Sequence, residues 1–278
     1  MYCKLGLKIS AVLLLVIAST ANAQRAPDTA TMDRGDGITR IGFDFGLTLP
    51  DKPPAPYDAA LRVEAYGQYV ANSGLGIYGS LPVAHSFGGD GPPMPDDATA
   101  LGNVELGGLY VLSGDSLSWV FRGGVALPTA SDSVDGVPTN TVATPPRLTD
   151  IALARPDALY LRFGTTPLVH ANKMFFQADL GADFGIGIGD GSKPDHFLRF
   201  NLGGGIDLGF LALGLELVNL AQIDDDDDNE QFVHALSFTI RFMGKALQPV
   251  IAVGSPLDDS GRAQVKLYAA VGIQIAFR

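Results

Sequence analysis

Twelve segments of this sequence alternate apolar and polar residues, as strands with two unlike faces do. The clearest is Phe176-Gln177-Ala178-Asp179-Leu180-Gly181-Ala182-Asp183-Phe184. Because successive side chains of a strand point to opposite sides, this segment has one apolar face and one polar, partly charged face. Residues 198–208 and 265–277 repeat the pattern. The sequence therefore predicts an all-β fold whose strands separate two different environments.

Residues 1–23 are expected to be a cleaved signal peptide. Lys4 and Lys8 precede an apolar run at 11–18, and Ala-Asn-Ala at 21–23 supplies a small-residue cleavage site. The run is shorter than the roughly 20 residues that a membrane-spanning helix needs. The single cysteine, Cys3, lies in this segment, so we expect a mature chain from Gln24 without disulfides or cysteine-based metal sites. Its 17 basic and 30 acidic residues give a net charge of −13, which disfavours nucleic acid as a partner.

The lengths of the connections distinguish a membrane barrel from a soluble sandwich. Odd-numbered connections are long or acidic and even-numbered ones are short, as in outer-membrane barrels with long extracellular loops and short periplasmic turns. A sandwich gives no reason for this alternation. We predict a transmembrane antiparallel β-barrel of twelve strands over residues 37–278, after a flexible lead at 24–36. The strands are expected at 37–48, 58–71, 74–85, 102–113, 116–128, 157–169, 173–188, 196–208, 210–221, 231–243, 246–255 and 262–278.

The polar strand faces carry both signs of charge in equal number. A balanced set inside a closed wall can pair across strands, which removes the cost of unpaired buried charge. Alternatively these residues line a narrow aqueous path, because a barrel of twelve strands can be either filled or open. For a constriction we single out Glu64, Arg122, Asp179, Arg199 and Glu216. The full set of candidate pore-lining residues is Arg40, Asp44, Arg62, Glu64, Glu105, Arg122, Arg162, Asp179, Asp183, Arg199, Asp207, Glu216, Arg241 and Lys266.

Aromatic residues near strand ends are expected to face lipid and, in part, to form interfacial girdles. Ordinary apolar packing is the alternative for any one of them. They are Tyr110, Trp119, Tyr160, Phe163, Phe176, Phe210, Phe242 and Phe277.

The connection at 129–156 is the longest in the chain and is rich in proline and small polar residues. Such a composition predicts irregular structure rather than a strand. The segment either folds inward and narrows the lumen or extends into solvent. In the first case, deleting residues 131–150 is expected to raise the conductance.

An acidic run, Asp224, Asp225, Asp226, Asp227 and Asp228, stands in a predicted loop. Oxygen clusters of this kind attract Ca²⁺ or Mg²⁺, but Asn229 stands where an EF-hand loop needs glycine. The alternatives are a loose cation site and a diffuse acidic mouth that concentrates cations. No resident cofactor is otherwise expected.

The sequence offers little for catalysis. Its four histidines are scattered, and no Gly-x-Ser-x-Gly or His-Glu-x-x-His motif occurs. His234 and Ser237 are three apart and so face opposite ways on a strand, unlike the pair that a barrel lipase needs. A barrel protease would rest on the acidic loops alone. We therefore expect a protein that is not an enzyme.

The segment Ala100-Leu101-Gly102-Asn103-Val104-Glu105-Leu106-Gly107-Gly108-Leu109-Tyr110-Val111-Leu112 resembles one that is frequent in a broad, transporter-like family of outer-membrane barrels. That family includes proteins encoded with meta-cleavage pathways of phenol degradation. The resemblance implies an outer-membrane barrel involved in uptake of small, hydrophobic molecules, and it transfers no site residues.

These observations favour a bacterial outer-membrane barrel that acts as a passive channel or transporter for small solutes. Its expected partners are outer-membrane lipid, lipopolysaccharide and the solute, and its oligomeric state is open. One alternative is a closed structural or adhesive barrel with cation-binding acidic loops. The third is a lipase or protease built in a barrel.

Overall fold

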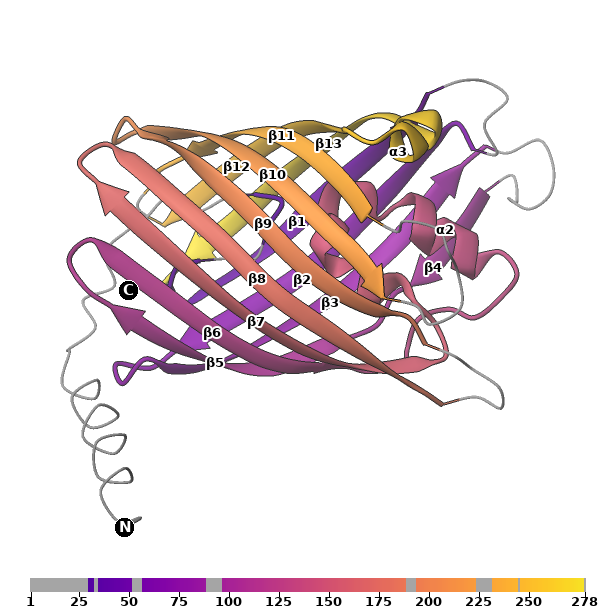
Figure 1. Ribbon diagram of the computed structural model, residues 1–278, viewed down its shortest axis with the longest axis horizontal. Coiled ribbons are helices and arrows are strands. Elements are labelled where there is room, and N and C mark those ends of the chain that lie inside the picture. Colours follow the sequence, from indigo (N-terminus) through magenta and orange to yellow (C-terminus); the bar gives the residue numbers. More distant parts are fainter. Residues whose placement is uncertain are drawn as a thin grey trace, which may run out of the picture.

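The computed structural model describes residues 30–32, 35–51, 57–88, 97–188, 194–223, 232–244 and 246–277 as a closed antiparallel barrel (Figure 1). The predicted signal peptide and the acidic run at 224–228 lie outside the described residues. Among the described residues, no helix is long and apolar enough to cross a bilayer.

The wall consists of strands that follow one another around the barrel in chain order. They are β1 (Arg40–Pro50), β2 (Ala59–Val70), β3 (Leu75–Phe87), β4 (Asp97–Leu101), β5 (Glu105–Ser113), β6 (Leu117–Ala126), β7 (Ala158–Ala171), β8 (Met174–Gly187), β9 (His196–Asp207), β10 (Leu211–Ile223), β11 (Phe232–Phe242), β12 (Leu247–Pro256) and β13 (Val265–Ala276).

Closure comes from the pairing of the first and last strands. β1 pairs with β13 on one side and with β2 on the other, and every remaining neighbour is also antiparallel. β4 and β5 both pair with β3, one after the other, so together they occupy a single position in the wall. The barrel therefore has twelve strand positions, which confirms the predicted fold class.

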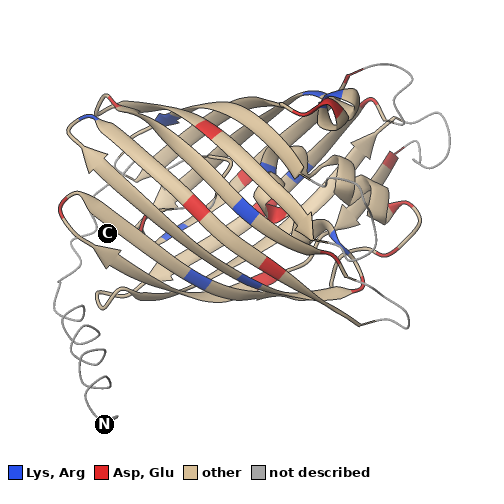
Figure 2. Ribbon diagram, in the orientation of Figure 1, with Lys and Arg blue, Asp and Glu red and all other residues tan. Residues whose placement is uncertain are grey.

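The two faces of the wall differ as the alternation predicts. In β1, Phe43 is 50% exposed while Arg40 is completely buried. Along β8, Gln177, Asp179 and Asp183 are buried and the apolar Phe176 and Phe184 are exposed. The apolar residues thus cover the outside and the polar residues line the interior. Figure 2 shows that acidic and basic residues lie on neighbouring strands of the wall.

The two ends of the barrel also differ. Short turns and the start of β1 and end of β13 lie at one end, whereas the other end carries α2 (Gly136–Val142) and α3 (Asp259–Gln264) in long connections (Figure 1). A segment of 3-10 helix, η2 (Pro145–Ala154), follows α2 before β7 begins. The connection at 129–156 therefore contains no strand, as expected, but it includes α2 and η2, and the backbone of η2 leaves the helical conformation at Arg147 and Asp150.

Three details differ from the sequence-based expectations. The fourth predicted strand, 102–113, begins only at Glu105, and the residues of β4 (Asp97–Leu101), expected in a loop, pair with β3 before residues 102–104 leave the sheet. Tyr160, predicted to lie near the lipid, is buried inside, since it lies two residues from the inward-facing Arg162 on β7. The last strand begins only at Val265, because α3 occupies the residues before it.

Candidate functional site

Two segments that are not part of the wall lie inside the lumen. One is η2, with buried Arg147, Asp150 and Leu153. The other is the N-terminal lead, of which residues 30–32 and 35–36 are described; Thr31, Met32 and Asp36 are each almost completely buried. The sequence predicts a flexible lead, but this part of it packs against the interior of the barrel.

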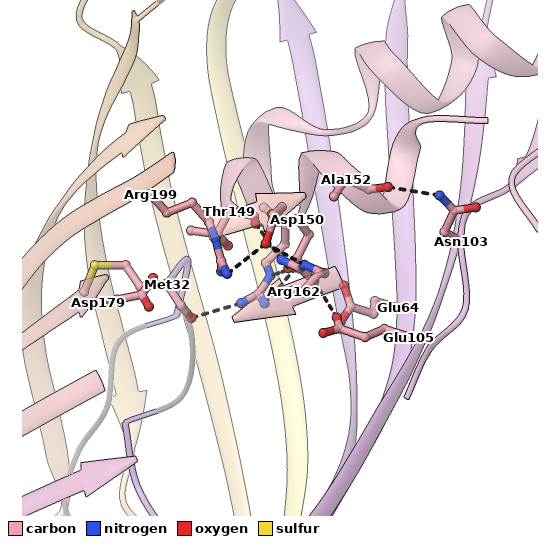
Figure 3. Close-up of polar contacts among 12 residues, drawn as sticks. Met32, Glu64, Asn103, Glu105, Thr149, Asp150, Ala152, Arg162, Asp179 and Arg199 are labelled. Carbon is pink, nitrogen blue, oxygen red and sulfur yellow. Dashed lines mark hydrogen bonds and ion pairs between the residues drawn. The ribbon is translucent and has the colours of Figure 1, made fainter. Parts of the chain in front are cut away.

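The break between β4 and β5 positions η2. The backbone N–H of Asn103 donates to the carbonyl of Leu153 at 2.7 Å, and its side-chain amide donates to the carbonyls of Ala152 (3.0 Å) and Arg155 (2.7 Å) (Figure 3). The side-chain oxygen of Asn103 accepts from the N–H of Ala130 at 2.8 Å. One buried side chain therefore fixes both flanks of the inward-folded connection.

Apolar packing also holds the C-terminal part of η2 against the wall. Ala152 and Leu153 are completely buried in a cluster with Tyr160, Phe197 and Leu220 of the wall. Gly102, next to the Asn103 anchor, has no room for a side chain, because a Cβ there would lie 2.7 Å from the carbonyl oxygen of Leu153. The Leu-Gly-Asn sequence thus allows the loop backbone to approach the wall closely.

Asp150 is the centre of a cluster of buried arginines, the Asp150 hub, formed with Arg62, Arg147 and Arg162. Its Oδ2 lies 2.8 Å from Nη2 of Arg147 and 3.6 Å from Nη2 of Arg62. Its Oδ1 lies 3.2 Å from Nη2 of Arg162 on β7. Figure 3 shows Asp150 and Arg162 pointing toward one another, with Glu64 and Glu105 beside Arg162.

The wall arginines of the hub are also paired with wall carboxylates. Arg62 donates to Glu64 at 2.8 Å, and Arg162 pairs with Glu105 and, at 3.2 Å, with Asp183, its neighbour across the β7–β8 pair. Arg199 of β9 reaches the same Asp183 at 3.1 Å. Each acid thus offsets the desolvation of an arginine, as a buried network requires.

Arg199 can reach Asp183 because its neighbour on β8 is a glycine. Gly181 lies opposite Arg199 in the register, and a Cβ at Gly181 would lie 2.5 Å from the Arg199 guanidinium. Any larger residue would push this side chain away from the hub.

The charge state of Asp150 follows from these contacts. Burial alone would raise the pKa of its carboxyl, but the guanidinium groups of Arg147, Arg162, Arg62 and Arg199 hold that pKa well below its usual range. Asp150 is therefore ionised throughout the physiological range.

The N-terminal lead is held mainly by one wall carboxylate, Glu216 of β10. Its two oxygens accept from the N–H groups of Ala30 and Thr31, each at 2.8 Å, and from the Thr31 hydroxyl at 2.5 Å. The Thr239 hydroxyl also donates to Glu216. Glu216 is completely buried, so these donors replace water around its charge.

The two lumen segments touch each other. Nη1 of Arg147 donates to the carbonyls of Ala30 (3.3 Å) and Met32 (3.2 Å), and the Thr149 hydroxyl donates to the carbonyl of Thr31 at 3.3 Å. Met32 packs against Val218, Ala235 and Tyr268 of the wall and against Leu148 of η2. Together they form a continuous obstruction.

Closer to β1, the lead contacts the wall again. The Gln68 side chain donates to the carbonyls of Asp36 (3.3 Å) and Ile38 (3.1 Å), and Asp36 forms an ion pair with Arg40. Arg40 also donates to Gln274 at 3.0 Å. These contacts hold residues 35–39 inside the barrel before the chain enters β1.

A polar cavity of about 40 Å³ remains beside the hub. Its lining includes the phenols of Tyr66 and Tyr78, the amide of Gln68, and both acidic and basic side chains. The charged residues around it are Arg122, Arg147, Arg162, Arg199, Glu64, Glu105 and Asp150. This space lies directly beside the arginines of the hub.

The structure places most of the candidate pore-lining residues inside. Arg40, Arg62, Glu64, Glu105, Arg162, Asp179, Asp183, Arg199, Glu216 and Arg241 are buried, and Asp44, Arg122 and Asp207 are half-buried. Asp207 lies at a turn, where it accepts from the Gly209 N–H at 2.7 Å. Lys266 is exposed, because β13 shifts register there against β1. A role in permeation stays a prediction for all of them.

Only part of this set is brought together. Six of these residues, Arg62, Glu64, Glu105, Arg162, Asp183 and Arg199, belong to the network around the hub. Asp179 accepts from the side chain of Asn201 at 2.7 Å. Arg147 and Asp150 were not among the residues predicted from the sequence. The available signal was the presence of two opposite charges three residues apart in the otherwise uncharged segment 145–154. Thr31 and Asp36 in the lead were not predicted either.

The remaining sequence candidates do not form a site among the described residues. No group of three or more metal-ligating side chains occurs there. His85 contacts Thr99 at 2.8 Å and His234 contacts Asn219 at 2.7 Å, on different parts of the wall. The five aspartates predicted to attract cations lie outside the described residues.

The chain matches no protein-family model and has no similar curated protein. Among solved structures it is similar to the KdgM porin, with a TM-score of 0.51 and 11% identity over 86% of this chain and 99% of that one. It is also similar to the COG4313 outer membrane channel from Pseudomonas putida F1, with a TM-score of 0.57 and 13% identity over 91% of this chain and all of that one. At these identities the likeness concerns the fold, which is that of porin-like outer-membrane barrels.

Proposed function

We propose that this protein is an outer-membrane channel for small solutes and that the structure represents its closed state. The observation that carries the proposal is that a polar barrel interior is crossed by two segments that take no part in strand pairing, η2 and the lead. Because the wall closes through β1 and β13 without them, either segment can move without opening the sheet. A gated path needs such a division between wall and obstruction.

Placement in the outer membrane is supported by the outside of the wall. Large apolar side chains are exposed on every side, for example Phe43, Ile77 and Phe200. Lipid suits such a surface, and a closed barrel leaves no unpaired backbone edge in the bilayer. Outer-membrane lipid and lipopolysaccharide are accordingly the partners that we propose.

Finer features of the function rest on the sequence alone. Uptake of hydrophobic molecules from aromatic degradation is an expectation from the segment at 100–112. Loose binding of Ca²⁺ or Mg²⁺ at Asp224–Asp228 is an expectation from their composition. Both stay proposals, as does the absence of enzyme activity.

A closed structural or adhesive barrel is the second candidate, and one observation favours it. The buried charges of the lumen are extensively paired, and the cavity beside them holds only about 40 Å³. In that case the network stabilises the barrel and nothing passes through it.

Single-channel recording distinguishes the two. The refolded mature protein is placed in a planar bilayer under gradients of potassium chloride. Discrete current steps are expected for a channel, and they should be brief or rare because the closed state predominates. A folded barrel that migrates faster on gels before heating, yet stays silent over a wide voltage range, would favour the structural candidate.

A further inference from the structure

The Asp150 hub places a carboxylate of the chain among guanidinium groups from separate elements. Arg62 comes from β2, Arg162 from β7 and Arg199 from β9, whereas Asp150 and Arg147 come from η2. Three strands that are distant in sequence thus direct arginines toward one oxyanion. Arginine is the side chain best suited to recognise carboxylate and phosphate groups, because its planar fork matches two oxygens at once.

We propose that these arginines form a binding site for the carboxylate or phosphate group of a solute, and that Asp150 occupies this site in the closed state. The inference deepens the proposed channel function, since the site lies where the lumen is obstructed. A solute anion would take the place of the Asp150 side chain as η2 withdraws.

The contacts of Arg162 support this exchange. Its Nη2 donates to Asp150 Oδ1 at 3.2 Å and to the Thr149 carbonyl at 2.9 Å. Both acceptors belong to η2, whereas the contacts with Glu105 and Asp183 belong to the wall. Withdrawal of η2 removes two acceptors from one nitrogen and leaves the wall pairs in place, and two oxygens of a solute could replace them.

The balance of charge supports it as well. In Asp150→Ala, where η2 keeps its place, Arg62, Arg147 and Arg162 each lose the Asp150 carboxylate as a partner. Loss of one partner from a buried ion-pair network is costly, so an external anion should be drawn to the position of the missing carboxylate.

The adjoining cavity supplies the space and further recognition groups. Arg122 lies over the Tyr78 ring, with its Cζ 5.8 Å from the ring centroid, and both line the cavity. Gln68, Tyr66 and Ser80 add an amide and hydroxyl groups to the same lining. A solute with hydroxyl groups next to its acidic group fits this chemistry.

The test is chemical rescue of Asp150→Ala in the full mature chain. The variant should melt at a lower temperature than the wild type, and sodium acetate should restore at least half of the loss in a saturable way, because a ligand that binds only the folded state stabilises it. Sodium chloride at equal ionic strength controls for screening. Asp258→Ala, which removes the N-cap carboxylate of α3 and none of the hub contacts, controls for general effects of acetate. Inorganic phosphate in place of acetate shows which group the site prefers.

Two further results keep the proposal falsifiable. If Asp150→Ala does not fold, Asp150→Asn retains the volume of the side chain, and its reversal potential in a potassium chloride gradient should shift toward that of chloride. Rescue by neither acetate nor phosphate beyond chloride, or an unshifted reversal potential in a conducting Asp150→Asn, would overturn the site while leaving the channel intact. Rescue in a barrel that never conducts would instead retain the site and refute the channel.

Discussion

The two segments inside the lumen are held in opposite ways. η2 belongs to a connection that joins the wall at both ends, β6 and β7; it is anchored by Asn103 and places Asp150 among arginines. The lead joins the wall only at Arg40, and its described residues 30–32 are held by hydrogen bonds to Glu216 and by contacts with η2. The obstruction of one lumen can thus combine a firmly held segment, η2, with a more readily released segment, the lead. We expect the lead to leave first.

Energetics point the same way. Removing one partner of a buried ion pair costs about 3–5 kcal/mol, because the other charge is left without compensation. A hydrogen bond to a charged group contributes about 1.5–3 kcal/mol, and water entering from the lumen can replace it. Withdrawal of η2 separates several ion pairs at once. Withdrawal of residues 30–32 of the lead, with Asp36 still paired to Arg40, breaks hydrogen bonds and leaves Glu216 with Thr239 and incoming water.

Removing the lead should have the largest effect on conduction. A mature chain that begins at Gly35 lacks the residues that contact Glu216 and Arg147, but it keeps Asp36 as the ion-pair partner of Arg40 and every strand of the wall. Its single-channel conductance, or the fraction of time that it is open, should rise several-fold over the wild type. The measurement is the planar-bilayer recording described above.

Two point variants control this experiment. Glu216→Gln keeps the volume of the side chain but removes its charge, so it should reproduce part of the increase. Ser237→Ala removes a 3.1 Å contact with the Thr31 hydroxyl and a hydrogen bond with the Tyr268 side chain but no charge, and it should behave nearly as the wild type. A truncated chain that conducts no better than the full one would mean that η2 alone closes the lumen.

Loosening η2 should have a smaller effect. Asn103→Ala removes the side chain that bonds Ala130, Ala152 and Arg155, and each buried group left unpaired costs about 1–3 kcal/mol. Because the hub and the apolar packing of Leu153 persist, we expect a lower melting temperature with brief additional openings rather than a fully open channel. If Asn103→Ala conducted as well as the truncated chain, η2 would not be the more firmly held of the two segments.

The sequence predicted the wall better than its contents, for a physical reason. Alternation is a local pattern, so Gln177, Asp179 and Asp183 could be assigned to the inner face from their spacing alone. Position 160 shows that the same pattern, applied strictly, would also have placed Tyr160 inside with Arg162. The register between neighbouring strands then brings the charges together, as Arg162 and Asp183 demonstrate.

The obstruction follows no such period. Asp150 and Arg147 lie in a connection whose prolines predict irregular structure but give no direction, and their partners come from β2, β7 and β9. Thr31 lies 185 residues from Glu216 in the sequence. Only the folded wall determines that these groups meet, so the hypothesis of an inward fold at 129–156 could be stated from the sequence but not decided.

A change of pH should have the smallest effect on conduction of the changes considered, and the pKa of Asp150 in η2 determines its direction. The folded state lowers the pKa of Asp150, so its ion pairs contribute fully above the unfolded value of about 3.9 and are lost as the pH falls toward the lower folded value. The truncated chain, in which η2 alone obstructs the lumen, should therefore conduct equally from about pH 8 to pH 5 as far as Asp150 is concerned, with openings increasing only below about pH 4. In Asp150→Asn, which has no carboxyl to protonate, that acid-induced increase should be smaller. A rise in current already between about pH 7 and pH 5 would show that another titratable group controls the position of η2. The Asp150 hub would then stabilise the fold without holding η2 in the closed position.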